Sequence, residues 1–214
     1  MQDTFKHKGM RKALIDELRQ KGIQDKSVLE AFYAVPRHFF LDKTFMEQAY
    51  SNMAFQIGAD QTISHPYTVA FQSQLLEIKK GEKVLEIGTG SGFQTAILCE
   101  LGAKVYSIER QKELFLKTKH LLPKIGYKPT LKYGDGYEGW PTYGPFDKVI
   151  VTCGAPFIPE KLVEQLKIGG RLVIPVGEGV KQEMILITKK EDGDTDIHKK
   201  GVFSFVPMLK NTSK

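Results

Sequence analysis

The segment Lys83–Phe93 reads KVLEIGTGSGF, with glycines at positions 88, 90 and 92 directly after an apolar run. This succession predicts a strand that ends at about Ile87 and a helix that begins near Phe93, as in nucleotide-binding α/β folds. Glycines let backbone amides come close to a ligand, and the N-terminus of the next helix carries roughly +0.5 charge, which suits a carboxylate or phosphate. The dinucleotide fingerprint needs glycine or alanine where this chain has Phe93, so the segment favours a nucleotide-type ligand other than NAD.

Apolar runs alternate with helical patterns beyond Gly81, which is typical of an α/β domain with a mostly parallel sheet. Two further strands, Glu183–Thr188 and Val202–Val206, flank the charged stretch Lys189–Lys200, which we expect to be an exposed hairpin loop. The prediction is a seven-stranded, mostly parallel Rossmann-like sheet flanked by helices. Its parallel strands are expected at Lys83–Ile87, Lys104–Ile108, Thr130–Tyr133, Asp147–Thr152 and Arg171–Val176, joined by helices near Phe93–Leu101, Gln111–Ile125 and Glu160–Leu166.

The N-terminal part of the chain has helical patterns. Apolar residues at helical spacing predict one helix over Met10–Leu18 and a second over Lys26–Ala34. The second helix is expected to end before Pro36, because the residue preceding a proline avoids helical geometry. Residues 37–62 show no regular pattern and are expected to be irregular.

A third helix is predicted from the stretch that begins at Ser64. Ser64 is a candidate N-cap, Pro66 suits the first turn, and the apolar pattern continues to about Ile78. The only boundary that the patterns suggest lies near residue 80. We therefore expect a helical region over 1–80 that carries a substrate-facing loop and packs on a ligand-binding α/β core over 81–214.

Two acidic residues follow predicted strands at the edge where ligands of open α/β folds collect. Glu109 lies at the end of the second strand, where a carboxylate can accept hydrogen bonds from two ribose hydroxyls. Asp135 follows the third strand within Gly134–Gly136 and could accept a hydrogen bond from an exocyclic amine. Each is also compatible with a simpler role, as a solvated residue or a turn residue.

Composition and residue spacing argue against several kinds of partner and site. Lysine and arginine exceed aspartate and glutamate by 31 − 25 = +6, but the lysines are spread along the chain, so we expect no nucleic-acid partner. The two cysteines and five histidines lack metal-ligand spacing, and no metal site is expected. No apolar run approaches the ~20 residues of a membrane span, and no targeting segment is apparent, so a cytoplasmic location and no membrane partner are expected.

The runs Val84–Gln94 and Val105–Arg110 resemble the protein-L-isoaspartate O-methyltransferase family. Further segments resemble the family in the same order along the chain, so the similarity spans about residues 28–207. Such ordered similarity is more specific than one glycine motif. The further segments are Val35–Phe39, Gln61–Ser64, Gly134–Gly136, Gly139–Pro141, Pro145–Asp147, Gly169–Gly177 and Phe205–Pro207.

The resemblance implies S-adenosylmethionine as the methyl donor and isoaspartyl proteins and peptides as substrates. It implies glycines beside the methionine portion of the donor, an acid on the ribose and a Gly-Asp-Gly turn near adenine. The cofactor-binding residues that it implies are Thr62, Glu86, Gly88, Thr89, Gly90, Gly92, Glu109, Arg110, Asp135 and Gly136.

The active-site serine of the family falls on Ser64, and its segment is implied to face the substrate. This sequence departs from the family pattern at Ala59–Asp60, at His65 in place of a common glutamine, and at Cys153–Gly154 in place of small alanines. These departures bear on peptide preference.

Methyl transfer from a sulfonium to a carboxylate needs no strong general base, because the nucleophile is already ionised near neutral pH. We therefore interpret Ser64 as a residue that orients the substrate carboxylate, while a role as helix cap alone remains open. Other readings also remain open: a methyltransferase of a small molecule or RNA, and a noncatalytic nucleotide-binding protein. A monomer is the default expectation.

Overall fold

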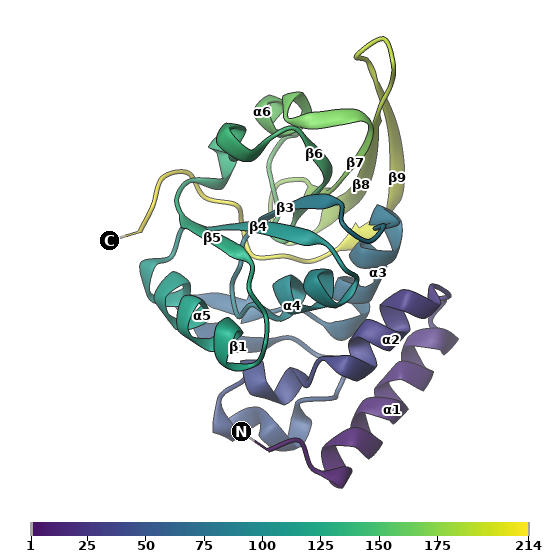
Figure 1. Ribbon diagram of the computed structural model, residues 1–214, viewed down its shortest axis with the longest axis vertical. Coiled ribbons are helices and arrows are strands. Elements are labelled where there is room, and N and C mark those ends of the chain that lie inside the picture. The colour runs from purple at the N-terminus through teal and green to yellow at the C-terminus, as the bar shows by residue number, and fades with distance from the viewer. Residues whose placement is uncertain (1, 214) are drawn as a thin grey trace.

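The strands of the central sheet form where the sequence has its short apolar runs. The computed structural model describes residues 2–213, and within them the sheet has seven strands in the order β5-β4-β3-β6-β7-β8-β9 (Figure 1). The five strands β3 to β7 run parallel, and β8 runs antiparallel to both of its neighbours, which confirms the predicted fold class. The bounds are β3 Lys83–Ile87, β4 Lys104–Glu109, β5 Thr130–Tyr133, β6 Phe146–Val151, β7 Leu166–Val176, β8 Gln182–Lys189 and β9 Thr195–Phe203.

The central strands are apolar throughout because both faces of the sheet are covered. On β3, Val84 packs with residues of helices α3 (Pro66–Leu76) and α4 (Phe93–Glu100). Its neighbour Leu85 points to the opposite face, toward Leu162 of the short helix α6 (Glu160–Glu164). Alternate side chains of a strand thus supply two separate apolar layers.

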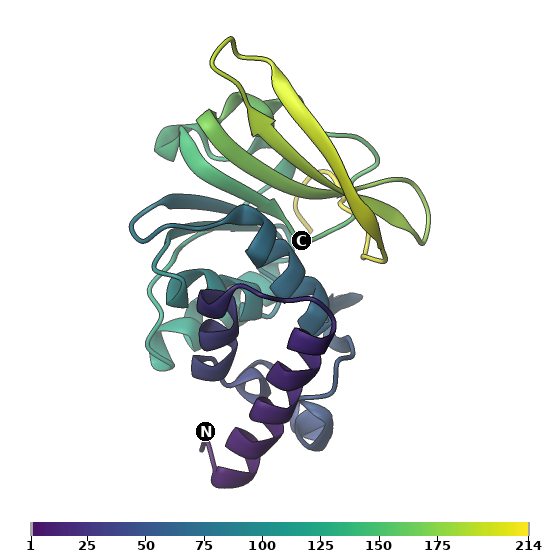
Figure 2. The same cartoon turned by 90° about the vertical axis from the view of Figure 1, so that its right-hand side faces the viewer.

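Strand β9 begins seven residues before the predicted start, so the expectation of an exposed loop over Lys189–Lys200 was wrong. The connection is a short turn closed by the backbone amide of Lys190, which donates to the carbonyl oxygen of Asp194 at 2.7 Å. Charged side chains are compatible with this strand because β9 lies at the edge of the sheet, where they remain in water (Figure 2).

Helix α1 (Phe5–Gln20) and helix α2 (Lys26–Ala34) lie at the opposite end of the long axis from β8 and β9 (Figure 1). A capping box between Thr4 and His7 explains why α1 starts earlier than the apolar spacing indicates. None of the helices within residues 2–213 is long and apolar enough to cross a membrane.

Residues 37–62 are more ordered than predicted. They contain the 3-10 helices η1 (Arg37–Phe40) and η2 (Lys43–Gln48) and, with the next residue, an antiparallel hairpin of β1 (Phe55–Gly58) and β2 (Gln61–Ile63). The hairpin turn places Ala59 and Asp60 at φ values of 51° and 54°. Alanine rarely adopts this conformation, and the pair Ala59-Asp60 is not one of the Asn-Gly or Asp-Gly pairs that predict a hairpin turn from sequence.

The predicted capping role of Ser64 was wrong. The N-cap of α3 is His65, with no side-chain capping bond, and Pro66 is the first helical residue. The Ser64 hydroxyl consequently has no part in starting this helix.

The two sides of residue 80 share one apolar cluster. Leu18, Phe32 and Ile63 of the N-terminal part pack with Phe93 and Leu114 of the α/β part. This cluster joins the N-terminal region to the helices that follow the glycine-rich segment. The division at residue 80 stays a prediction.

Candidate active site

One cavity lies outside the carboxyl ends of the parallel strands. The chain runs from β3 outward to β4 and β5, and then returns to β6 on the other side of β3, so the strand order reverses there. Ligands of open α/β sheets bind at this kind of crevice. The cavity is lined by the ends of β3, β4 and β6, by Gln61–Ser64, by Gly136 and by Val206–Leu209.

The floor of the cavity is the glycine-rich segment Gly88–Ser91. Gly88 has φ +96°, and a Cβ atom on it would lie 2.6 Å from Oγ1 of Thr152. That hydroxyl donates to the carbonyl oxygens of Ile87 at 3.0 Å and Gly88 at 2.7 Å. The missing side chain therefore lets β3 and β6 close together directly beneath the cavity.

Glu109 forms one wall of the cavity and is buried. Its Oε2 accepts the backbone N–H of Gly90 at 2.8 Å, and its Oε1 accepts that of Gln111 at 2.7 Å. Burial raises the pKa of Glu109, and these amide donors act against the shift. Each carboxylate oxygen has a lone pair left for a ligand, so the group suits the two hydroxyls of a ribose.

The opposite wall comes from the N-terminal region. Thr62 and Ser64 line the same cavity as Gly88–Ser91, although they belong to the other side of residue 80. Thr62 and Ser64 also line a smaller pocket beside the cavity, which we call the side pocket, together with His65, Thr68 and Ser204. The structure thus brings Ser64 and the glycine-rich segment to one shared cavity.

Three predicted cofactor residues do not line the cavity. Glu86 is fully buried below it, and its Oε2 accepts the Thr95 hydroxyl at 2.6 Å. Gly92 is the N-cap of α4 and faces Leu122 of α5 (Lys112–Lys124). The other predicted residues line the cavity, namely Thr62, Ser64, Gly88, Thr89, Gly90, Glu109, Arg110 and Gly136.

Asp135, the third of these residues, is engaged by the end of the chain. Its Oδ2 accepts the backbone N–H of Asn211 at 2.6 Å, and its Oδ1 accepts that of Tyr137 at 2.9 Å. The carboxylate thus joins the turn after β5 to the C-terminal segment. A contact of Asp135 with adenine stays a prediction.

Sequence reasoning missed other lining residues. Gln94, Thr152 and Val206–Leu209 line the cavity, but none of them was among the predicted site residues. The segment Phe205–Pro207 resembles the family, but its distance along the chain gave no indication that Val206 and Pro207 line the same cavity as Gly136. Cys153, noted as a departure, also lines the cavity. Burial raises the pKa of Cys153 to about 12, so this thiol stays protonated and is no nucleophile at neutral pH.

Glu86 should make stability depend on pH. Burial raises its pKa to about 8, with the Thr95 hydroxyl acting against the shift. The folded chain then keeps a proton that the unfolded chain loses above its ordinary pKa of 4.5. The contribution of Glu86 to the free energy of unfolding is therefore fully present below about pH 4.5. It declines as the pH rises toward 8, by up to about 1.4 kcal/mol per pH unit.

We therefore expect Glu86→Gln to become progressively more stable than the wild type between about pH 5 and pH 8. Denaturant melts of both proteins across this range measure the difference. Glu82→Gln serves as the control, because Glu82 is partly exposed and lies just before the same strand. A constant difference in unfolding free energy across the range would contradict a protonated Glu86.

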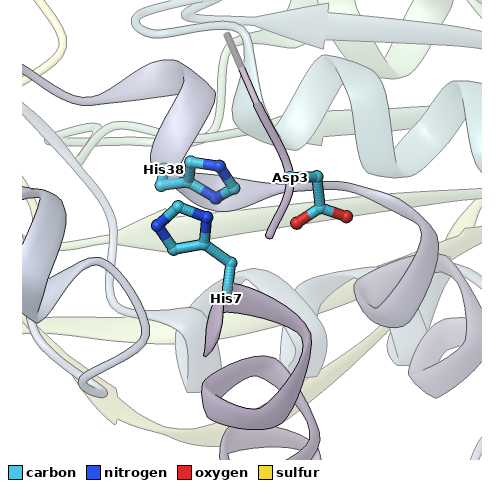
Figure 3. A group of neighbouring side chains, drawn as sticks. All are labelled: Asp3, His7 and His38. Atoms are coloured by element: carbon cyan, nitrogen blue, oxygen red, sulfur yellow. The ribbon is translucent and has the colours of Figure 1, made fainter. Parts of the chain in front are cut away.

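The spacing of the cysteines and histidines predicted no metal site, yet His7 and His38 come together with Asp3 near the N-terminus (Figure 3). The two imidazole rings stack at 3.8 Å, and Nδ1 of His38 bonds the Tyr50 hydroxyl at 2.7 Å. Both carboxylate oxygens of Asp3 accept from Arg11. These contacts explain the cluster as packing and an ion pair.

The family model for protein-L-isoaspartate(D-aspartate) O-methyltransferases matches residues 9–213 of this chain. A protein-L-isoaspartate O-methyltransferase of Christiangramia forsetii is 59% identical over 212 residues, which cover 99% of each chain. One from Salinibacter ruber is 43% identical and covers 97% of this chain and 94% of that one.

Two solved structures have the same fold as this chain. A protein-L-isoaspartate O-methyltransferase at 28% identity superposes with a TM-score of 0.84 over 94% of this chain and 66% of that one. A Plasmodium falciparum structure described as a protein-L-isoaspartate O-methyltransferase in complex with S-adenosyl-L-homocysteine shares the fold, with a TM-score of 0.82 at 24% identity, over 96% of this chain and 99% of that one. From the match along nearly its whole length, the chain belongs to the protein-L-isoaspartate(D-aspartate) O-methyltransferase family.

Proposed function

We propose that this chain transfers the methyl group of S-adenosylmethionine to the free α-carboxylate of L-isoaspartyl residues in proteins and peptides. The observation that carries the proposal is the shared cavity, with the glycine-rich segment and Glu109 on one side and Ser64 on the other. Family membership supports the same donor and the same substrate. One chain supplies both walls of the cavity, so we propose that it acts as a monomer.

The lining residues fit the donor. Glu109 offers two buried carboxylate oxygens to a ribose, and Gly88 and Gly90 leave backbone exposed in the cavity. When bound, S-adenosylmethionine supplies a methyl group on a positively charged sulfur. Gly136 is buried, and a Cβ atom there would lie 2.3 Å from Cγ2 of Ile87, so this position keeps space between β3 and the turn after β5.

The protein's main task is alignment. The substrate carboxylate is ionised at neutral pH and needs no base, and positioning of reacting groups lowers barriers by up to about 7 to 11 kcal/mol in favourable cases. We propose that the Ser64 hydroxyl donates to one oxygen of this carboxylate and so directs the other toward the glycine-rich segment. Residues of the side pocket, among them His65 and Ser204, then receive the peptide next to the modified residue.

A transfer experiment tests the proposed function. Labelled methyl groups from S-adenosylmethionine should reach an isoaspartyl peptide at a rate at least ~100-fold above its normal aspartyl twin, because only the former presents the α-carboxylate at the required distance. The label should leave the peptide on mild alkaline treatment, as expected of an ester. Equal labelling of both peptides would indicate another acceptor, and donor binding without transfer would indicate a binding protein.

A further inference from the structure

Arg37 is a buried cation that has no acidic partner among the described residues. The side chain is 1% exposed, yet within residues 2–213 no carboxylate lies in ion-pair range of its guanidinium. Instead Nη1 donates to the carbonyl oxygen of Ala49 at 2.6 Å, and Nη2 donates to those of Met53 at 2.8 Å and Ser64 at 3.1 Å. Nε has no hydrogen-bond partner among the described residues.

A charge in this state is costly for a protein to keep. Buried charges are normally paired, and an unpaired one loses its hydration without a compensating ion. The guanidinium lies 5.4 Å from the ring centre of Phe55 and 5.7 Å from that of Phe93, which offsets part of this cost. Burial lowers the pKa of Arg37 to about 9, so it still carries its charge at neutral pH.

Another buried arginine of the chain, Arg11, does have an acidic partner. Arg11 is also nearly inaccessible, at 3% exposure, but it is paired with Asp3 at 2.9 Å. Arg11 contacts neither the cavity nor the Ser64 segment. The missing partner is therefore particular to Arg37 and does not follow from burial alone.

The charge of Arg37 acts on the substrate-facing wall. Its Nη2 is one hydrogen bond from the backbone of Ser64, which lines both the cavity and the side pocket. Burial and then the nearby Arg37 lower the pKa of His65, the next residue in the side pocket. The ring of Phe93, the first residue of α4, lies 5.7 Å from the guanidinium, and Phe93 also lines the cavity.

We propose that Arg37 is a positioning residue for the substrate: it holds the Ser64 segment by its carbonyl and adds positive charge behind the wall of the cavity that faces a bound isoaspartyl carboxylate. This inference rests on the proposed function. The substrate carboxylate is anionic and the methyl ester is neutral, so the attraction favours substrate over product. Arg37 should therefore affect substrate affinity more than the rate of the chemical step.

The test compares two variants that lose the guanidinium fork but differ in charge, Arg37→Lys and Arg37→Gln. The wild type and both variants are titrated with an isoaspartyl peptide and, separately, with a twin peptide whose α-carboxylate is replaced by a neutral carboxamide. S-adenosylhomocysteine is present in every titration, so that no methyl transfer takes place. In the wild type and in Arg37→Lys we expect the acid to bind at least ~10-fold more tightly than the amide. In Arg37→Gln this preference should fall to within about twofold.

A purely structural role gives a different result. If Arg37 only tethers carbonyl groups, both variants weaken the acid and the amide alike and keep their ratio, which overturns the proposal. Arg11→Gln is the matched control and should keep the wild-type ratio, although it loses stability. If Arg37→Gln does not fold, Arg37→Met is the second neutral variant, because an unbranched apolar chain fits between Phe55 and Phe93.

Two further readouts separate this proposal from the proposed function. Wild-type protein that binds the isoaspartyl peptide no better than its normal aspartyl twin would mean that the proposed function itself fails.

Under steady-state conditions Arg37→Gln should raise KM at least ~10-fold and lower kcat less than about threefold. A fall in kcat with unchanged KM would also overturn the assignment.

Discussion

Gly88→Ala is expected to weaken S-adenosylmethionine binding at least ~100-fold in a protein that still folds. The new methyl group would lie 2.6 Å from Oγ1 of Thr152, whose hydroxyl holds the carbonyl oxygens of Ile87 and Gly88. Residue 88 also has φ +96°, which costs an L-residue about 1 to 2 kcal/mol. Because Thr152 is itself a strand-end residue of the cavity, relief of the clash displaces the cavity floor.

Gly81→Ala is the matched control for this substitution. Gly81 has a similar φ of +89°, but no atom of residues 2–213 lies within 4 Å of a Cβ atom there. The control should lose about 1 to 2 kcal/mol of stability and keep donor affinity within about twofold. Equilibrium binding and denaturant melts of both variants measure the two effects. If Gly88→Ala binds the donor as well as Gly81→Ala does, the glycine-rich segment is not the donor site.

Ser64→Ala is expected to reduce turnover of an isoaspartyl peptide at least ~100-fold, since a misplaced carboxylate oxygen costs about that factor. Ser64 lines the cavity, and its hydroxyl does not cap α3. The unfolding free energy should therefore change by less than about 0.5 kcal/mol. Steady-state kinetics and melts on the same samples test both statements.

Ser27→Ala is a suitable control for the loss of a serine hydroxyl. Ser27 also stands near the start of a helix, but it is exposed and does not line the cavity or the side pocket. Its substitution should leave turnover unchanged. Full activity of Ser64→Ala would remove Ser64 from the mechanism, and a large loss of stability would show that the hydroxyl supports the fold after all.

The N-terminal half illustrates why local patterns were insufficient. The hairpin of β1 and β2 has strands of only four and three residues, and its turn uses Ala59, which has no intrinsic preference for positive φ. Its Phe55, Ile57 and Ile63 are buried in the apolar cluster that also contains Phe93. Packing against the α/β part therefore selects this conformation, and a short window of sequence contains no record of such packing.

In the C-terminal half, the predictions for β9 and Asp135 were incomplete for a different reason. Strand β9 carries charged residues because its position at the sheet edge exposes it, and the pairing with β8 supplies the hydrogen bonds that its composition does not predict. Asp135 was placed correctly at the end of a parallel strand, but the backbone of Asn211 occupies one of its oxygens. Contacts between residues that are 76 positions apart depend on the path of the whole chain.

The sequence by itself determined the α/β sheet, the glycine-rich turn after β3 and the acid at the end of β4, because each depends on spacing within one strand and its adjoining turn. The family resemblance added Ser64 and the substrate. Only the tertiary structure decided which residues meet across the cavity and that Glu86 lies below it. It also decided that Arg37 is buried beside Ser64, with no acid of the described part of the chain in ion-pair range. The physical reason is that burial and charge pairing arise from long-range packing, which is settled only when distant segments come together.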